Sequence, residues 1–126
     1  MAGEQILVVE DNEKNMKLFR DVLEVMGYRT LEATTGRQAV ELALEHTPDL
    51  VLMDIELPDI DGVEALRQLR ADERTATTPV LAVTAQAMLG DRNGFLAAGF
   101  DGYLSKPVDV GELVGTVRQQ CDERGR

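Results

Sequence analysis

The chain has 126 residues, of which 44% are hydrophobic and 29% charged, a balance typical of one soluble globular domain and unlike that of a disordered chain. Its formal net charge of −10 argues against nucleic-acid binding, because no cluster of basic residues is available to neutralise phosphates. No apolar run approaches the ~20 residues of a membrane-spanning helix, and a single cysteine excludes an internal disulfide. The N-terminal segment lacks the pattern of a signal peptide, so we expect a cytoplasmic protein without a membrane partner.

The first half of the chain alternates apolar runs with helical patterns. Ile6–Val9 is a four-residue run that is apolar on both faces, as in a central strand that helices cover on both sides. A helix is predicted next, because apolar residues recur at helical spacing up to the stop signal at Gly27: Met16, Phe19, Val22, Leu23 and Met26. Tyr28–Ala33 is predicted to be an edge strand. A second helix follows, with one apolar face that ends before Pro48: Ala39, Val40, Ala43 and Leu44.

The second half repeats this alternation. Leu50–Met53 and Val80–Val83 are doubly apolar and are predicted to be further central strands. The helix between them has an apolar face made of Val63, Leu66 and Leu69. A less regular helix is predicted over about 87–98, followed by an edge strand at Gly102–Leu104. Asp109 is placed to cap a last helix, which is marked by Leu113, Val114 and Val117. Five strand–helix alternations predict an α/β fold with a doubly wound parallel sheet, in one domain whose core runs from about 4 to about 121.

Polar residues follow the strands, and in such a sheet ligands bind at the carboxyl ends of the strands. We therefore expect three carboxylates, a hydroxyl and one ammonium to converge on a single rim, because these residues follow the strands: Glu10, Asp11, Asp54, Thr84, and Ser105 with Lys106. Converging carboxylates repel one another, and a hard divalent cation relieves the conflict. Mg²⁺ suits such a site because it prefers a few carboxylate oxygens and retains several waters. The alternative is that each carboxylate merely ends a strand in solvent.

Four segments together resemble the receiver domain of two-component response regulators: LVVEDN at 7–12, LVLMDIELPDIDG at 50–62, PVLAVTA at 79–85 and GYLSKP at 102–107. The resemblance covers nearly the whole chain. It implies a flavodoxin-like fold with a five-stranded parallel sheet in the order 2-1-3-4-5 and five helices. It also implies one receiver domain over 1–126 without an output domain. EDNEKNMKLF at 10–19 and MDIELPDIDG at 53–62 are similar to DivK-like single-domain regulators.

The resemblance implies a metal site beside a phosphoacceptor. Asp54 is implied to be the acceptor and, with Asp11, a direct ligand of Mg²⁺. Glu10 would hold the metal mainly through water, and the backbone carbonyl of Glu56 would supply a further oxygen. The acidic side chain of Glu56 would either deter or orient water near the phosphoryl group.

Other residues are implied to sense the phosphoryl group. Thr84 would hydrogen-bond it, Lys106 would pair with it, and Ala85 is small enough to leave it room. Tyr103 stands at the aromatic switch position. The Lys106–Pro107 bond is expected to be cis, which aims the lysine inward.

The implied function is a signalling switch and not an enzyme that turns over a substrate. A histidine kinase or histidine phosphotransferase would phosphorylate Asp54, and slow self-dephosphorylation would be the only further chemistry. A downstream protein would bind the face made by the fourth helix, the last strand and the fifth helix.

Two other functions are compatible with parts of the pattern. Mg²⁺-dependent phosphatases with an aspartyl nucleophile commonly carry a second carboxylate two residues later, where Glu56 stands. They also carry a hydroxyl residue at the position of Pro58 and a cap insertion, which this chain lacks. A flavin-binding protein of the same fold needs a phosphate-cradling loop after the first strand, where EDNEKN would repel phosphate.

Overall fold

A computed structural model describes residues 3–85, 94 and 97–124, and its five strands form one parallel sheet in the order β2-β1-β3-β4-β5. The strands are β1 (Gln5–Val9), β2 (Arg29–Ala33), β3 (Leu50–Asp54), β4 (Val80–Thr84) and β5 (Gly102–Ser105). The described helices are α1 (Glu13–Val25), α2 (Gly36–His46), α3 (Gly62–Ala71) and α5 (Val110–Arg124). The helix predicted over about 87–98 lies mostly outside the described residues. The predicted strand order is confirmed, and so are the edge positions of β2 and β5.

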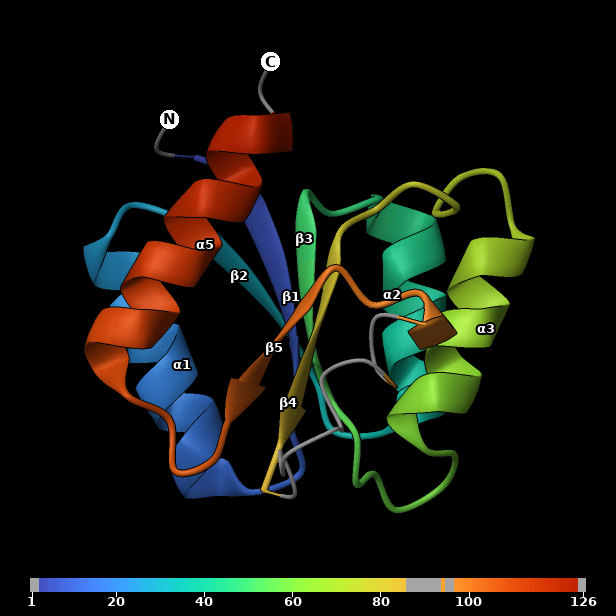
Figure 1. Cartoon of the computed structure of the whole chain (residues 1–126), viewed down its shortest axis with the longest axis horizontal. Helices are drawn as coiled ribbons and strands as arrows, with labels where there is room; N and C mark the ends of the chain where they lie inside the picture. The colour runs from blue at the N-terminus through green and yellow to red at the C-terminus, as the bar shows by residue number, and fades with distance from the viewer. Residues whose placement is uncertain (1–2, 86–93, 95–96, 125–126) are drawn as a thin grey trace.

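Helices cover both faces of the sheet, α1 and α5 on one side and α2 and α3 on the other (Figure 1). Consecutive strand residues point to opposite faces, so Ile6 and Val8 join the α1/α5 core while Leu7 and Val9 join the α2/α3 core. The three central strands β1, β3 and β4 are therefore apolar at nearly every position. No helix among the described residues is long and apolar enough to span a bilayer.

Polar side chains fix where the helices begin. Asn12 accepts a hydrogen bond from the Asn15 N–H at the start of α1, and the Thr35 hydroxyl accepts one from the Gln38 N–H at the start of α2. The predicted cap of α5 is confirmed, because the Asp109 carboxylate accepts the Gly111 N–H at 2.8 Å. Such caps satisfy N–H groups that have no partner within the helix.

One residue of the predicted apolar face of α3 is placed differently. Leu66 and Leu69 are fully buried, but Val63 is 41% exposed. The buried stripe of α3 is centred on Gly62, Ala65, Leu66 and Leu69. Val63 lies roughly 100° around the helix axis from Gly62, which puts it at the edge of that stripe.

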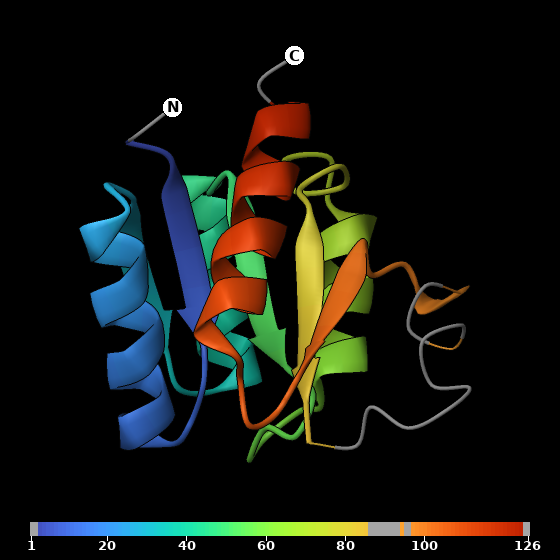
Figure 2. The same cartoon turned by 60° about the vertical axis from the view of Figure 1, so that its left-hand side comes forward.

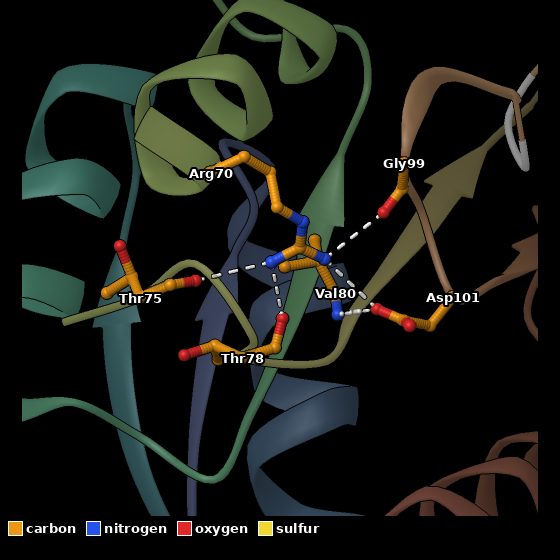
Figure 3. Close-up of polar contacts among 6 residues, drawn as sticks. All are labelled: Arg70, Thr75, Thr78, Val80, Gly99 and Asp101. Carbon is orange, nitrogen blue, oxygen red and sulfur yellow. Dashed lines mark hydrogen bonds and ion pairs between the residues drawn. The ribbon is translucent and has the colours of Figure 1, made fainter. Parts of the chain in front are cut away.

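Arg70, near the end of α3, binds the chain where β4 and β5 begin (Figure 3). These starts lie at the edge of the sheet opposite the polar rim. Its guanidinium donates to the Asp101 carboxylate at 3.1 Å, and the same carboxylate oxygen accepts the Val80 N–H at 2.8 Å. It also donates to three backbone carbonyls, those of Thr78 at 2.7 Å, Gly99 at 3.1 Å and Thr75 at 3.3 Å. One side chain thus joins α3, the loop before β4 and the turn before β5.

Replacing Arg70 with Met should lower the free energy of unfolding by about 2–3 kcal/mol, because several part-buried acceptors lose their donor while the apolar stem is retained. Urea unfolding measures this loss. Arg67→Met is the matched control: Arg67 is 69% exposed and pairs with Glu64 of its own helix, so little change is expected. Equal losses in the two variants would contradict the role given to Arg70.

Candidate functional site

The strands run toward the end of the molecule opposite both termini, and the candidate site lies at that end (Figure 2). Val9 of β1 is level with Met53 of β3, so Glu10 follows beside Asp54. Asp54 is in turn level with Val83 of β4, which brings Thr84 to the same rim. Register in the sheet therefore gathers residues that are far apart in the sequence.

Three carboxylates converge there as predicted. Oxygens of Glu10, Asp11 and Asp54 lie within 4.8 Å of one another. Glu10 is 1% exposed and Asp54 is 2% exposed, whereas Asp11 is exposed. The alternative that each carboxylate merely ends a strand in solvent is therefore wrong for Glu10 and Asp54.

Lys106 brings one ammonium to this cluster. Its Nζ lies 2.9 Å from Oε1 of Glu10 and 3.0 Å from Oδ2 of Asp54. Its backbone N–H donates to the Thr84 carbonyl at 2.8 Å, which continues the pairing of β4 with β5 beyond Ser105. The Lys106–Pro107 bond is cis, as expected.

The electrostatics of the cluster follow from burial. Desolvation and the Asp54 charge raise the pKa of Glu10, although hydrogen bonds from Lys106 and from the Asn12 N–H lower it in part. Burial lowers the pKa of Lys106, but hydrogen bonds to Glu10 and Asp54 outweigh it, and the net shift is upward. Two buried carboxylates face one ammonium, so the cluster has an excess of negative charge that suits a cation.

The other predicted residues lie around this cluster. The Glu56 backbone N–H donates to Oδ1 of Asp54 at 2.9 Å, while the Glu56 side chain is exposed. Thr84 is 2% exposed at the end of β4, and Ala85 after it is exposed. Tyr103 of β5 is partly buried against the α2/α3 core. Its ring therefore does not stand free in water at the sheet edge.

Sequence reasoning assigned no role to Asn12. Its backbone N–H donates to Oε2 of Glu10 at 3.1 Å, and its side chain caps α1. Asn12 thus orients a site carboxylate and starts a helix. The signal that could have found it is an Asn directly before the first turn of a predicted helix.

Comparisons with known proteins agree with this geometry. The family description "Response regulator receiver domain" matches residues 6–118. The polar-differentiation response regulator DivK of Brucella ovis is 47% identical over 113 residues, which are 90% of this chain and 92% of that protein.

Solved structures show the same fold. The receiver domain of a sensor histidine kinase from Pseudomonas aeruginosa, with a magnesium ion coordinated in its active site cleft, is 40% identical with a TM-score of 0.88. That match covers 96% of this chain and 99% of the other. A putative response regulator from Chloroflexus aurantiacus is 30% identical with a TM-score of 0.89, covering 95% of this chain and 98% of the other.

The raised pKa of Glu10 predicts how the stability of the metal-free protein depends on pH. Above the ordinary value of 4.5 and up to the raised value, the folded state binds the Glu10 proton more tightly than the unfolded state does. This contribution to stability is present below pH 4.5 and is lost as pH rises through that window. A Glu10→Gln variant cannot ionise, so its stability relative to the wild type should increase as pH rises.

Urea unfolding in EDTA, at pH values from about 4 to about 7.5, measures the difference in the free energy of unfolding between Glu10→Gln and the wild type. Glu56→Gln makes the same substitution on an exposed neighbouring carboxylate and is the control variant. If the difference in the free energy of unfolding between Glu10→Gln and the wild type does not change with pH, the prediction is wrong and the burial of Glu10 does not make stability depend on pH.

Proposed function

The chain belongs to the response regulator receiver domain family of phosphoryl-accepting signalling switches, and we propose that Asp54 is its acceptor in a Mg²⁺-dependent reaction. The observation that carries this proposal is the environment of Asp54. It is 2% exposed, bonded to Lys106 and grouped with Glu10 and Asp11. Neither neighbouring carboxylate is in direct contact with both an ammonium and the Glu56 backbone, as Asp54 is.

Asp54 is held as a nucleophile by two donors. The Glu56 N–H donates a hydrogen bond to Oδ1, and the Lys106 ammonium donates one to Oδ2. The plane of the carboxylate is therefore fixed before the phosphoryl donor arrives. Attack by a carboxylate oxygen on a phosphohistidine forms the P–O bond as the P–N bond breaks, and the imidazole leaves with the partner. Lys106 would neutralise charge on the transferred group.

The residues present fit a magnesium ion. Glu10, Asp11 and Asp54 would hold it, together with the backbone carbonyl of Glu56, because hard cations prefer oxygen ligands and the cluster has an excess of negative charge. When bound, the metal neutralises charge on the phosphoryl oxygens and orients them. The magnesium ion in the Pseudomonas receiver supports this assignment.

We further propose that the switch passes through Thr84 and Tyr103. The Thr84 hydroxyl would bond the new phosphoryl group, with small Ala85 leaving space, and the Tyr103 ring would follow into the space vacated. β5 and α5, with the segment predicted as the fourth helix, would then present a changed face to a downstream protein. Receivers act with histidine kinases and partner proteins, and here a histidine kinase or histidine phosphotransferase would be the cytoplasmic donor. Slow self-dephosphorylation would reset the switch.

Acetyl phosphate with Mg²⁺ should add one phosphoryl group to the wild-type protein, and Asp54→Asn should reduce the adduct to background because the nucleophile is gone. EDTA should abolish labelling of the wild type. Intact-mass analysis measures both effects, and Glu56→Gln, two residues away, is the control that should still be labelled. An undiminished adduct on Asp54→Asn would rule out Asp54 as the acceptor.

The Thr84→Ala variant should still accept the phosphoryl group, but phosphorylation should cause a smaller structural change in distant parts of the protein. In the wild type, phosphorylation should shift amide NMR signals through β5 and into α5, beyond the residues that contact Asp54. These distant shifts should fall to less than about half in Thr84→Ala, because the hydroxyl that the charged group recruits is missing. Ser105→Ala removes an exposed hydroxyl from the end of β5 and should leave them unchanged. Wild-type shifts in Thr84→Ala would show that the signal takes another route.

A further inference from the structure

The loop that follows Asp54, residues 55–61, is closed at its base. The Ile55 N–H donates to the Val83 carbonyl at 3.1 Å, and the Gly62 N–H donates to the Ile55 carbonyl at 3.0 Å. A Cβ atom on Gly62 would lie 2.7 Å from the Asp54 carbonyl oxygen, so only glycine allows α3 to start this close to the end of β3. Gly62 therefore has a structural role, which rests on this close approach.

The tip of the same loop is held by a different element. The Asp59 carboxylate accepts the Gly36 N–H at 2.8 Å and the Arg37 N–H at 3.0 Å, both in the first turn of α2. A Cβ atom on Gly36 would lie 2.4 Å from Cγ1 of Ile60. The loop therefore lies directly on the N-terminus of α2, and this contact also depends on a glycine.

The bond between Asp59 and α2 is charge-assisted. The N-terminus of a helix presents N–H groups without partners and favours a negative charge. Desolvation raises the pKa of Asp59, but hydrogen bonds from backbone N–H groups, first those of Arg37 and Gly36 and then those of Ile60 and Asp59 itself, outweigh it and hold the pKa at about 2. The carboxylate thus stays ionised at neutral pH.

The helix has a second, independent cap. The Thr35 hydroxyl accepts the Gln38 N–H at 3.1 Å within α2 itself. Since Thr35 already starts the helix, the main consequence of the Asp59 bonds is to fix the loop. Glu56 lies inside that loop, and its N–H binds the Asp54 carboxylate.

We propose that Asp59 is a positioning residue for the metal and phosphoryl site, because it pins the loop that carries Glu56 to the first turn of α2. This inference rests on the function proposed above. With base and tip both fixed, the Glu56 backbone is preorganised for Asp54 and for a cation, and the loop of residues 55–61 does not have to order when the metal binds. Asp59 contacts neither the metal nor the phosphoryl group and acts through Glu56.

Isothermal titration of the unphosphorylated full chain with MgCl₂ tests the proposal without using activity. Asp59→Ala should weaken Mg²⁺ binding by roughly tenfold, a typical loss when a group that supports a metal ligand is removed. Thr35→Ala is the matched control, because it removes a cap from the same helix terminus without touching the loop. Thermal melts of both variants identify a temperature at which both are fully folded, and the titrations are done at that temperature.

A second variant approaches the contact from the other side. Gly36→Ala should push Ile60 away and weaken Mg²⁺ binding to a similar extent. Because both changes release the same contact, the double variant Gly36→Ala/Asp59→Ala should bind Mg²⁺ at least as tightly as the single variant with the lower affinity. The proposal is overturned if Asp59→Ala binds Mg²⁺ like the wild type, or if Thr35→Ala loses as much affinity as Asp59→Ala. If the wild type itself binds no Mg²⁺, the proposed function fails together with this inference. If the wild type binds Mg²⁺ and Asp59→Ala binds it equally, the inference alone fails.

Discussion

Lys106 places a single ammonium against two carboxylates that are almost completely buried, Glu10 and Asp54. Burying one carboxylate without a partner is unfavourable, and burying two side by side adds their mutual repulsion. The ammonium offsets part of this cost and leaves an excess of negative charge. The excess suits a cation, and backbone N–H groups of the rim hold the two carboxylates in place.

The parallel sheet makes this arrangement possible. All five strands end at the same rim, so a carboxylate after β1, a carboxylate at the end of β3 and a lysine after β5 meet although they are far apart in the chain. Helices on both faces keep the strands dry, which gives the charges at their ends a low-dielectric surrounding on one side and water on the other. At the opposite end, Arg70 joins the starts of β4 and β5 through Asp101.

Loops supply the precision that the sheet alone does not. Asn12 orients Glu10, and Glu56 orients Asp54, each through a backbone N–H. The proposed switch needs such rigid support, because a flexible loop would let the carboxylates move when their charge or their partners change. The Asp59 bonds to α2 extend this support from the rim to a neighbouring helix.

Much of this protein could be predicted from its sequence, because the signals are local. Runs apolar on both faces identified the three central strands, and helical spacing with Gly27, Pro48 and Asp109 identified helix ends within a few residues. The carboxylates, Thr84 and Lys106 could be grouped because each lies at or just after the carboxyl end of a strand, whereas the proposed roles of Glu56, Ala85 and Tyr103 came from the family resemblance. Tertiary structure decided what depends on residues distant in the chain. The Asp59–Gly36 and Arg70–Asp101 bonds join residues 23 and 31 positions apart, and the exposure of Val63 depends on which face of α3 meets the sheet. Such pairings leave no periodic trace in the sequence, because they exist only after the sheet register has brought their elements together.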